Sequence, residues 1–102
     1  MPAIHLIEKK NLITSVPESK IEYESGYWVI STSQAGKLVG GEIYFHKRQI
    51  GPSHNGGIIV GFRIQQEGRY KERVVFRFKR GQEFFGVSAG EDGWEVEKKI
   101  VR

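Results

Sequence analysis

The stretch Val39–Gln65, with the sequence VGGEIYFHKRQIGPSHNGGIIVGFRIQ, decides the fold of this chain. Two glycine pairs, Gly40-Gly41 and Gly56-Gly57, each open a short apolar run. Between the runs lies the polar segment His46–Asn55, which holds two of the three histidines of the chain. Short apolar runs bounded by glycines are typical of strands. We therefore interpret the stretch as two strands of one small sheet, joined by a functional loop.

The composition predicts one β-rich domain that covers residues 1–102. Aromatic residues make up 12% of the chain, and each can bury a large area in a small core. The 13 glycines follow no period, which indicates many tight turns. The chain has no cysteine, which excludes disulfides, zinc ribbons and thiol nucleophiles and makes a reducing cytoplasm its natural setting. No apolar run is long enough for a membrane span, so we expect no membrane partner.

Alternating apolar residues predict further elements on both sides of this stretch. The expected strands are Ala3–Glu8, Gly26–Ser31, Gly41–His46, Gly57–Gln66, Tyr70–Lys79 and Phe84–Val87. A short helix is expected over Ser33–Val39, with Ser31, Thr32 and Ser33 as N-cap candidates and Gly40 as its end. The polar segment Lys9–Glu24 is expected to meander or to form a short helix. Trp94–Arg102 is expected to be a strand end or a short tail helix.

The alternation also predicts which side chains point into the core. In Gly57–Gln66, the expected apolar face consists of Ile58, Val60, Phe62 and Ile64. In Tyr70–Lys79, it consists of Val74, Phe76 and Phe78. The fold class is therefore α+β and mainly β. We expect five or six strands in a small bent sheet or a closed barrel, with one or two short helices.

The loop His46–Asn55 is long for a hairpin, and long loops on a rigid scaffold often carry binding sites. His46 and His54 lack an accompanying acid or a third ligand, and a contribution from His5 would be speculative. A triad of Ser53, His54 and Asp92 lacks the local sequence of a nucleophile elbow. We therefore expect neither a metal nor a cofactor, and no catalytic residues. A solvated loop without function is the alternative.

Aromatic and basic residues point to a different function. Trp28, Tyr44 and His46 could form a stacking wall for a planar ligand, although a core tryptophan is an equal alternative. The net charge is +4, and basic side chains recur along the expected strands. The candidate phosphate-binding residues are Lys47, Arg48, Arg63, Arg73, Arg77 and Lys79. A charge-alternating solvated strand would explain the same pattern without a ligand.

The layout resembles small bacterial proteins of the PUA-like superfold, in particular EVE-type domains, which are relatives of YTH and ASCH domains. The residues that carry the resemblance are Trp28–Ser31, Lys37–Gly40, Ile43–Lys47, Pro52-Ser53, Gly56-Gly57, Gly93-Trp94 and Glu97–Lys99. Residues 1–25 are not covered by it. The resemblance implies a β-barrel with a pocket for a nucleobase, often a modified one. It implies pocket residues at Trp28, Ser31, Ser33, Ser53, His54 and Asn55.

The sequence thus favours a non-enzymatic nucleic-acid reader, for DNA or RNA. The expected base pocket combines Trp28, Ser31, Ser33, Tyr44, His46, Ser53, His54 and Asn55. Its two walls would be Trp28–Ser33 and the loop His46–Asn55. A protein-interaction module whose positive charge is incidental is the alternative of a different class. A small hydrolase or nuclease that uses His46 and His54 is a third alternative.

Overall fold

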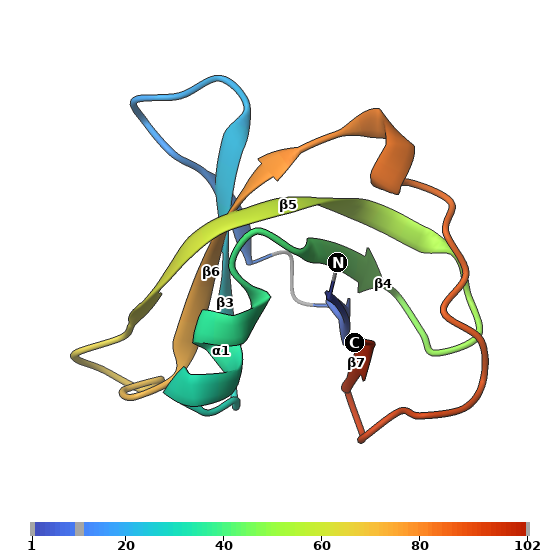
Figure 1. Cartoon of the computed structure of the whole chain (residues 1–102). Helices are drawn as coiled ribbons and strands as arrows, with labels where there is room; N and C mark the ends of the chain where they lie inside the picture. Colours follow the sequence, from blue (N-terminus) through green and yellow to red (C-terminus); the bar gives the residue numbers. More distant parts are fainter. Residues whose placement is uncertain (1, 10–11, 102) are drawn as a thin grey trace.

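The computed structural model describes residues 2–9 and 12–101, which form one strongly curved, mixed sheet with two short helices (Figure 1). The strands are β1 (Ala3–Ile7), β2 (Ile13–Ser15), β3 (Glu22–Trp28), β4 (Glu42–His46), β5 (Ser53–Ile64), β6 (Val74–Arg80) and β7 (Lys98–Val101). The helices are α1 (Thr32–Leu38) and the 3-10 turn η1 (Gln82–Phe84).

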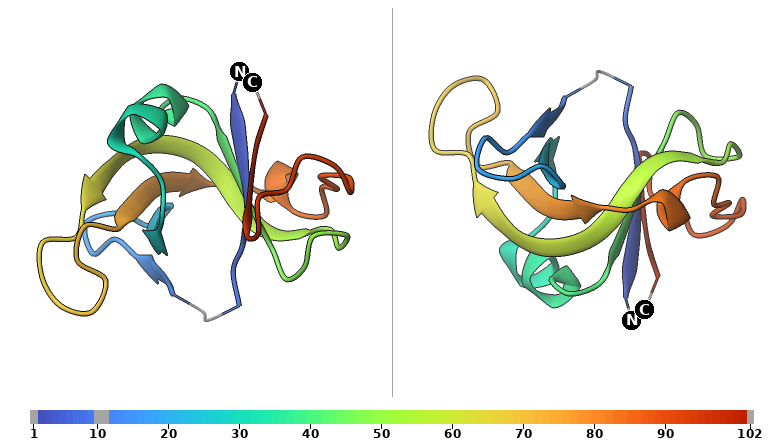
Figure 2. Two further views of the ribbon diagram at one scale, coloured as in Figure 1. Left: turned by 90° about the horizontal axis from the view of Figure 1, so that it is seen from below. Right: turned by 90° about the horizontal axis from the view of Figure 1, so that it is seen from above.

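The strand order is β2-β3-β6-β5-β4-β1-β7. The long strand β5 arches across the molecule between β6 and β4 (Figure 1). β1 inserts between β4, which runs parallel to it, and β7, which runs antiparallel. The first and last strands therefore lie side by side, as both views in Figure 2 show. β2 and β7 are the two edges of the sheet, so over the described residues the sheet does not close into a barrel.

The core lies on one face of this sheet, under α1. Its fully buried members are Ile4, Leu6, Ala35, Leu38, Ile43, Phe45, Ile59, Val74, Phe76 and Phe78. Ser31 caps α1 by accepting a hydrogen bond from the Gln34 backbone N–H, as the sequence predicts. Ala35 and Leu38 bury the helix against the sheet, whereas Val39, directly after the helix, is 42% exposed. Val39 already has extended backbone at the end of the helix, which turns its side chain outward.

The expected class, mainly β with a bent sheet, is confirmed, but several elements differ from the prediction. The expected strand Gly26–Ser31 is β3 (Glu22–Trp28) in the structure, and the expected strand Tyr70–Lys79 begins only at Val74. Residues 13–15 form strand β2, because they pair with Tyr23–Ser25 of β3. The expected strand Phe84–Val87 is absent from the described chain, where η1 ends at Phe84. In the expected tail Trp94–Arg102, the strand alternative is confirmed, because Lys98–Val101 form β7, and Arg102 lies outside the described residues. The sheet therefore has seven described strands and not five or six.

The prediction for the core face was right for β6 and half wrong for β5. Val74, Phe76 and Phe78 are fully buried. In β5, however, Ile59 is 1% exposed and Val60 is 39% exposed. The pairing of β5 with β6 shifts between Ile59 and Gly61. Such a bulge inserts one residue and moves the following side chains to the opposite face. Phe62 and Ile64 therefore pack on the core as expected, while Ile58 and Val60 do not belong to it.

The paired glycines allow backbones to approach closely. A Cβ on Gly57 would lie 1.8 Å from the Lys79 carbonyl oxygen, and a Cβ on Gly41 would lie 2.4 Å from the Pro2 carbonyl oxygen. Neither position can hold a side chain without moving the neighbouring strand or the segment before β1. Glycine is thus required at Gly57, where β5 lies against the Lys79 backbone of its neighbour β6.

Candidate functional site

A cavity of about 490 Å³ opens between β1 and the end of β3. We call it the aromatic cavity. Four further segments complete its walls: the chain after β1, the start of the segment that leads to α1, the β5–β6 loop and the turn before β7. Its described lining residues are Ile4, Leu6, Ile7, Glu8, Lys9, Leu12, Gly26, Tyr27, Trp28, Val29, Ile30, Tyr70, Arg73, Glu95, Val96, Glu97 and Lys98. A volume of this size is in the range of small-molecule sites.

Aromatic rings form the polarisable wall of this cavity. Tyr27 stacks on Tyr70 with a centroid distance of 4.7 Å and an angle of 7° between the rings. Trp28 is the next wall residue, and its Nε1–H donates to Ser25 Oγ at 3.2 Å. Ser25 is fully buried, so this hydrogen bond fixes the indole ring on a rigid part of the sheet.

A local irregularity brings Tyr27 and Trp28 to the same cavity. Consecutive residues of a regular strand point to opposite faces, which is what the sequence predicts for this pair. The pairing of β3 with β6 shifts between Ser25 and Trp28. Bulges of this kind re-aim side chains. Beside the bulge, a Cβ on Gly26 would lie 3.0 Å from Val75 Cγ2, so only a glycine fits here without crowding.

Charged groups surround the aromatic wall. The guanidinium of Arg73 lies 6.0 Å from the centre of the Tyr70 ring, and that of Arg69 lies 5.9 Å from it. Lys98 Nζ donates to the Val29 carbonyl oxygen at 2.9 Å and so links β7 to the segment after β3. Glu8 is only 3% exposed and lines the cavity. The cavity can thus offer stacking surfaces, cations and carboxylate acceptors to one planar ligand.

A second, shallower hollow of about 470 Å³ adjoins the aromatic cavity. We call it the cationic hollow. It shares Val29, Ile30, Arg73 and Lys98 with the aromatic cavity and adds Ser31, Gln34, Lys71 and Glu72.

The structure divides the predicted base pocket among different places. Trp28 lines the aromatic cavity, and Ser31 lines the cationic hollow. Ser33 is exposed in the first turn of α1. Tyr44, His46, Ser53, His54 and Asn55 line neither space. The two expected walls, Trp28–Ser33 and His46–Asn55, therefore do not border one cavity.

The predicted loop is also shorter than expected, because β5 begins at Ser53. Ser53 is buried, and its hydroxyl makes two hydrogen bonds: it donates to the Phe84 carbonyl oxygen at 2.6 Å and accepts from the Val87 N–H at 2.9 Å. This serine anchors the chain after η1 to β5. Sequence reasoning missed the role because the partners are more than thirty residues away.

Two of the predicted pocket residues belong to a histidine cluster on the sheet face opposite the core. His46 Nδ1–H donates to the Gly51 carbonyl oxygen at 2.9 Å, so its Nε2 accepts the Nδ1–H of His5, also at 2.9 Å. The His5 ring stacks on Tyr44 with a centroid distance of 4.7 Å. Trp94 packs edge-on against His46 at 5.7 Å. This arrangement closes the outer side of β1 and β4.

Burial keeps these histidines neutral at physiological pH. Burial, with the charges of His46 and Lys99, lowers the pKa of His5 to about 4. Burial also lowers the pKa of His46, against the opposing effect of its hydrogen bond to Gly51. For His54, burial and the charge of Lys47 lower the pKa, while the hydrogen bond to the Glu8 backbone opposes the shift.

Among the described residues, no group of three or more His, Asp or Glu side chains is arranged to hold a metal ion.

The predicted phosphate-binding residues also separate. Arg63 pairs with Glu24 at 3.2 Å, and Arg77 pairs with Glu22 at 2.5 Å. Both acids come from β3, which pairs with β6, so their carboxylates lie next to the basic side chains.

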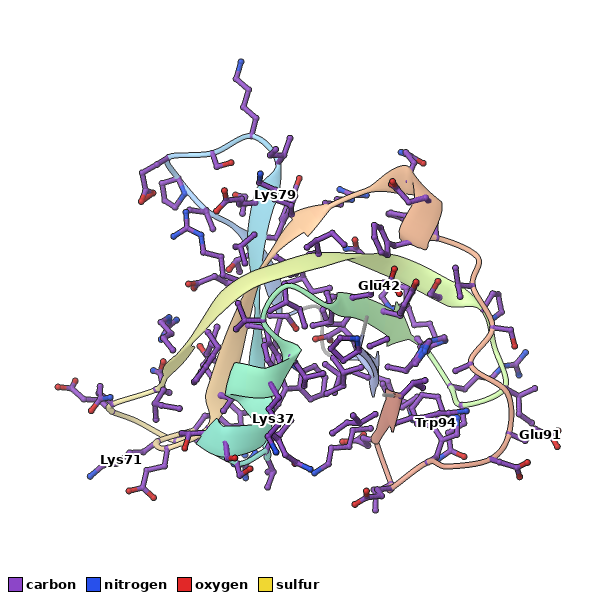
Figure 3. All side chains as sticks on the ribbon, viewed as in Figure 1. Lys37, Glu42, Lys71, Lys79, Glu91 and Trp94 are labelled. Atoms are coloured by element: carbon purple, nitrogen blue, oxygen red, sulfur yellow. The ribbon has the colours of Figure 1, made fainter. Side chains whose placement is uncertain are left out.

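The other four predicted cations lie in different parts of the molecule. Lys47 and Arg48 are exposed in the β4–β5 loop. Lys79 lies at the far end of β6 from the β5–β6 loop that carries Lys71 (Figure 3). Arg73 is the predicted cation that reaches the described walls of the aromatic cavity.

Sequence reasoning missed Tyr27, Tyr70, Glu8, Lys71 and Lys98 as site residues. Tyr70 and Lys71 follow the turn Glu67–Arg69, and no periodicity marks a turn residue as part of a cavity. Lys98 and Glu8 meet the others only because β1 and β7 pair. The sequence signal that could have identified the aromatic wall of the cavity was the adjacent pair Tyr27-Trp28 beside a glycine.

No helix among the described residues is long and apolar enough to cross a membrane. No protein-family model matches this chain, and no curated protein or solved structure does either.

Proposed function

We propose that this protein is a non-enzymatic nucleic-acid-binding module that holds a nucleobase in the aromatic cavity, in the manner of PUA-like, EVE-type domains. The observation that carries the proposal is the cavity of about 490 Å³ in which Tyr27, Trp28 and Tyr70 stand beside Arg73 and Lys98. Aromatic rings that stack on bases, next to cations that neutralise the backbone, are the usual parts of a single-strand binding site.

The apolar floor and the charged rim suit a base better than a purely apolar ligand. Ile4 and Leu6 are fully buried and form the floor. Glu8, Glu95 and Glu97 line the same space and can accept hydrogen bonds from amino or ring N–H groups of a base. A base enters such a site most readily from a single strand or a mismatch, because unstacking from a duplex costs a few kcal/mol.

Tyr70→Ala tests this proposal most directly. Tyr70 is only half-buried in a loop, so its removal leaves the core intact. Base stacking contributes about 1–3 kcal/mol, so affinity for a labelled single strand should fall roughly 5- to 150-fold. The matched control is Phe85→Ala, since Phe85 is a half-buried aromatic outside the cavity, with the Arg80 guanidinium 5.1 Å from its ring. The control should bind like the parent.

Gel-shift titrations of single-stranded and duplex DNA and RNA, over a series of salt concentrations, provide the measurement. Absence of any binding by the parent at low salt would contradict the proposed function. Equal losses in Tyr70→Ala and Phe85→Ala would contradict the assignment to the aromatic cavity.

A protein-interaction module is the second candidate, because two exposed apolar side chains flank the same cavity. Val29 is 64% exposed and Val96 is 85% exposed. Isolated exposed valines are ordinary, but a pair at a cavity rim can dock an apolar side chain of a partner. If this second candidate holds, the parent should bind no oligonucleotide at low salt, and Val29→Ser should abolish capture of a partner protein.

A further inference from the structure

We infer that the cationic hollow is an anion subsite that holds the phosphate of the same nucleotide whose base occupies the aromatic cavity. The inference rests on the proposed function and adds to it: the ligand is a nucleotide or a strand, and a nucleoside fills only half of the site. The two spaces are adjacent, since both are lined by Val29, Ile30, Arg73 and Lys98.

The side-chain charges balance in the aromatic cavity, whereas cations exceed carboxylates in the cationic hollow, so the first space suits a neutral base and the second suits a phosphate. Among the described residues of the aromatic cavity, Lys9, Arg73 and Lys98 are matched by Glu8, Glu95 and Glu97. Among those of the cationic hollow, Lys71, Arg73 and Lys98 face a single carboxylate, that of Glu72. A phosphate is therefore attracted to the hollow, whereas a neutral, planar base gains its stacking in the cavity.

The cations of the hollow are available to an outside anion. Within residues 2–9 and 12–101, Arg63 and Arg77 form ion pairs with acids of β3, but Lys71 and Arg73 form none. The Arg73 guanidinium carbon lies 6.0 Å from the centre of the Tyr70 ring, and a cation–π contact does not use up the N–H donors of a guanidinium. Lys98 uses one of its three N–H donors on the Val29 carbonyl oxygen, which leaves two for a phosphate.

Arg73 and Lys98 thus act as a shared wall between the two subsites. A nucleotide bound in this way spans the boundary at Val29–Ile30, with its sugar near the two shared cations. This placement differs from the basic stripe of Arg63, Arg77 and Lys79 that the sequence suggests, because the ion pairs with Glu22 and Glu24 neutralise much of that stripe.

The test separates phosphate recognition from base recognition. A fluorescein-labelled 12-nucleotide single strand is bound to the full chain and displaced with four competitor sets. These are the four common nucleosides, their 5′-monophosphates, trinucleotides without terminal phosphate, and inorganic phosphate. We expect monophosphates or trinucleotides to compete about tenfold better than nucleosides. The stronger of the two identifies the source as a terminal phosphate or an internal phosphodiester.

Lys71→Ala is the informative variant, because Lys71 is exposed and lines only the hollow. We expect it to weaken strand binding about three- to tenfold, to lower the salt slope by about 0.7, and to leave competition by nucleosides unchanged. Lys37→Ala is the control: Lys37 is an exposed lysine of α1 that lines neither space, and Figure 3 shows both side chains. Lys37→Ala should leave both the affinity for the strand and the salt slope unchanged.

The possible failures are distinguishable. If nucleosides compete as well as monophosphates and trinucleotides, or if Lys71→Ala behaves like Lys37→Ala, the anion subsite is wrong while base binding in the aromatic cavity stands. If the labelled strand does not bind the parent at low salt, both the subsite and the proposed function are overturned.

Discussion

The ring of Tyr27, in β3, stacks on the ring of Tyr70, in the β5–β6 loop, with centroids 4.7 Å apart and planes 7° from parallel. The contact joins a strand to a loop, and both rings line the aromatic cavity. The loop also carries Lys71 and Arg73, so its position decides where the cations of the hollow lie.

We expect the Tyr27–Tyr70 stack to couple the two residues energetically. Aromatic pairs contribute about 0.5–1.5 kcal/mol beyond the area that they bury. A double-mutant cycle with Tyr27→Ala and Tyr70→Ala, measured by urea unfolding, should return a coupling energy in this range. Additive effects of the two changes would show that the rings contribute independently and that the loop is held by other contacts.

Gly57→Ala should prevent folding or cost more than about 3 kcal/mol of unfolding free energy. The added Cβ would lie 1.8 Å from the Lys79 carbonyl oxygen, so β5 and β6 would have to separate where Gly57 pairs with Arg80. Gly61→Ala is the control in the same strand, because a Cβ there meets nothing within 4 Å. It should change stability by less than about 1 kcal/mol, as judged by thermal and urea unfolding. Equal effects at the two positions would contradict the close approach of β5 to the Lys79 backbone.

The stability of the fold should fall as the pH decreases from about 6.5 to about 4. The pKa of His5 is lowered to about 4 in the folded protein, whereas histidine in an unfolded chain titrates near 6.5. Between these values the unfolded state binds more protons, so acid favours unfolding. The stabilisation is fully present above about pH 6.5, and its loss at pH 4 amounts to up to about 3 kcal/mol.

His5→Phe isolates this contribution, because a phenyl ring can still stack on Tyr44 but cannot titrate. The variant should show a shallower decrease in unfolding free energy over the same pH range, whatever its absolute stability. Some decrease should remain, since burial also lowers the pKa values of His46 and His54. A variant with the parent's slope would show that His5 is not the group that titrates.

Val96→Asn should raise the unfolding free energy by about 0.5–1 kcal/mol. Val96 has φ of 58°, a left-handed conformation that is costly for a β-branched side chain. Its side chain is 85% exposed, so the substitution removes little packing. Asparagine tolerates this backbone conformation better. Val60→Asn, in the extended strand β5, is the control and should destabilise the protein. A loss of stability in Val96→Asn would refute the strain at this position.

Local patterns predicted most of the elements that depend on neighbours in the sequence. The burial of Val74, Phe76 and Phe78 follows from alternation, and the cap of α1 follows from the serines before it. The outward orientation of the Val60 side chain could not be predicted in this way, because it results from a bulge, and a bulge depends on the pairing of β5 with β6. β2 was missed for a similar reason: three residues form a strand only because β3 lies next to them.

The candidate site was predicted only at Trp28, Ser31 and Arg73. A cavity needs residues from several segments, and their meeting depends on strand order. The parallel pairing of β1 with β4 and the antiparallel pairing with β7 bring Glu8 and Lys98 to the aromatic rings. The same pairings carry His46 away from Trp28, to the opposite face beside His5.

The sequence by itself determined that this chain folds into a glycine-punctuated, aromatic sheet, because the size, polarity and order of side chains decide which faces leave water. Only the tertiary structure decided which polar groups are neutralised and which remain available. Glu22 and Glu24 engage Arg77 and Arg63 through strand pairing, whereas Lys71 and Arg73 are left beside the cavity. Electrostatic interactions weaken with distance, and the distances between remote residues exist only in the folded chain.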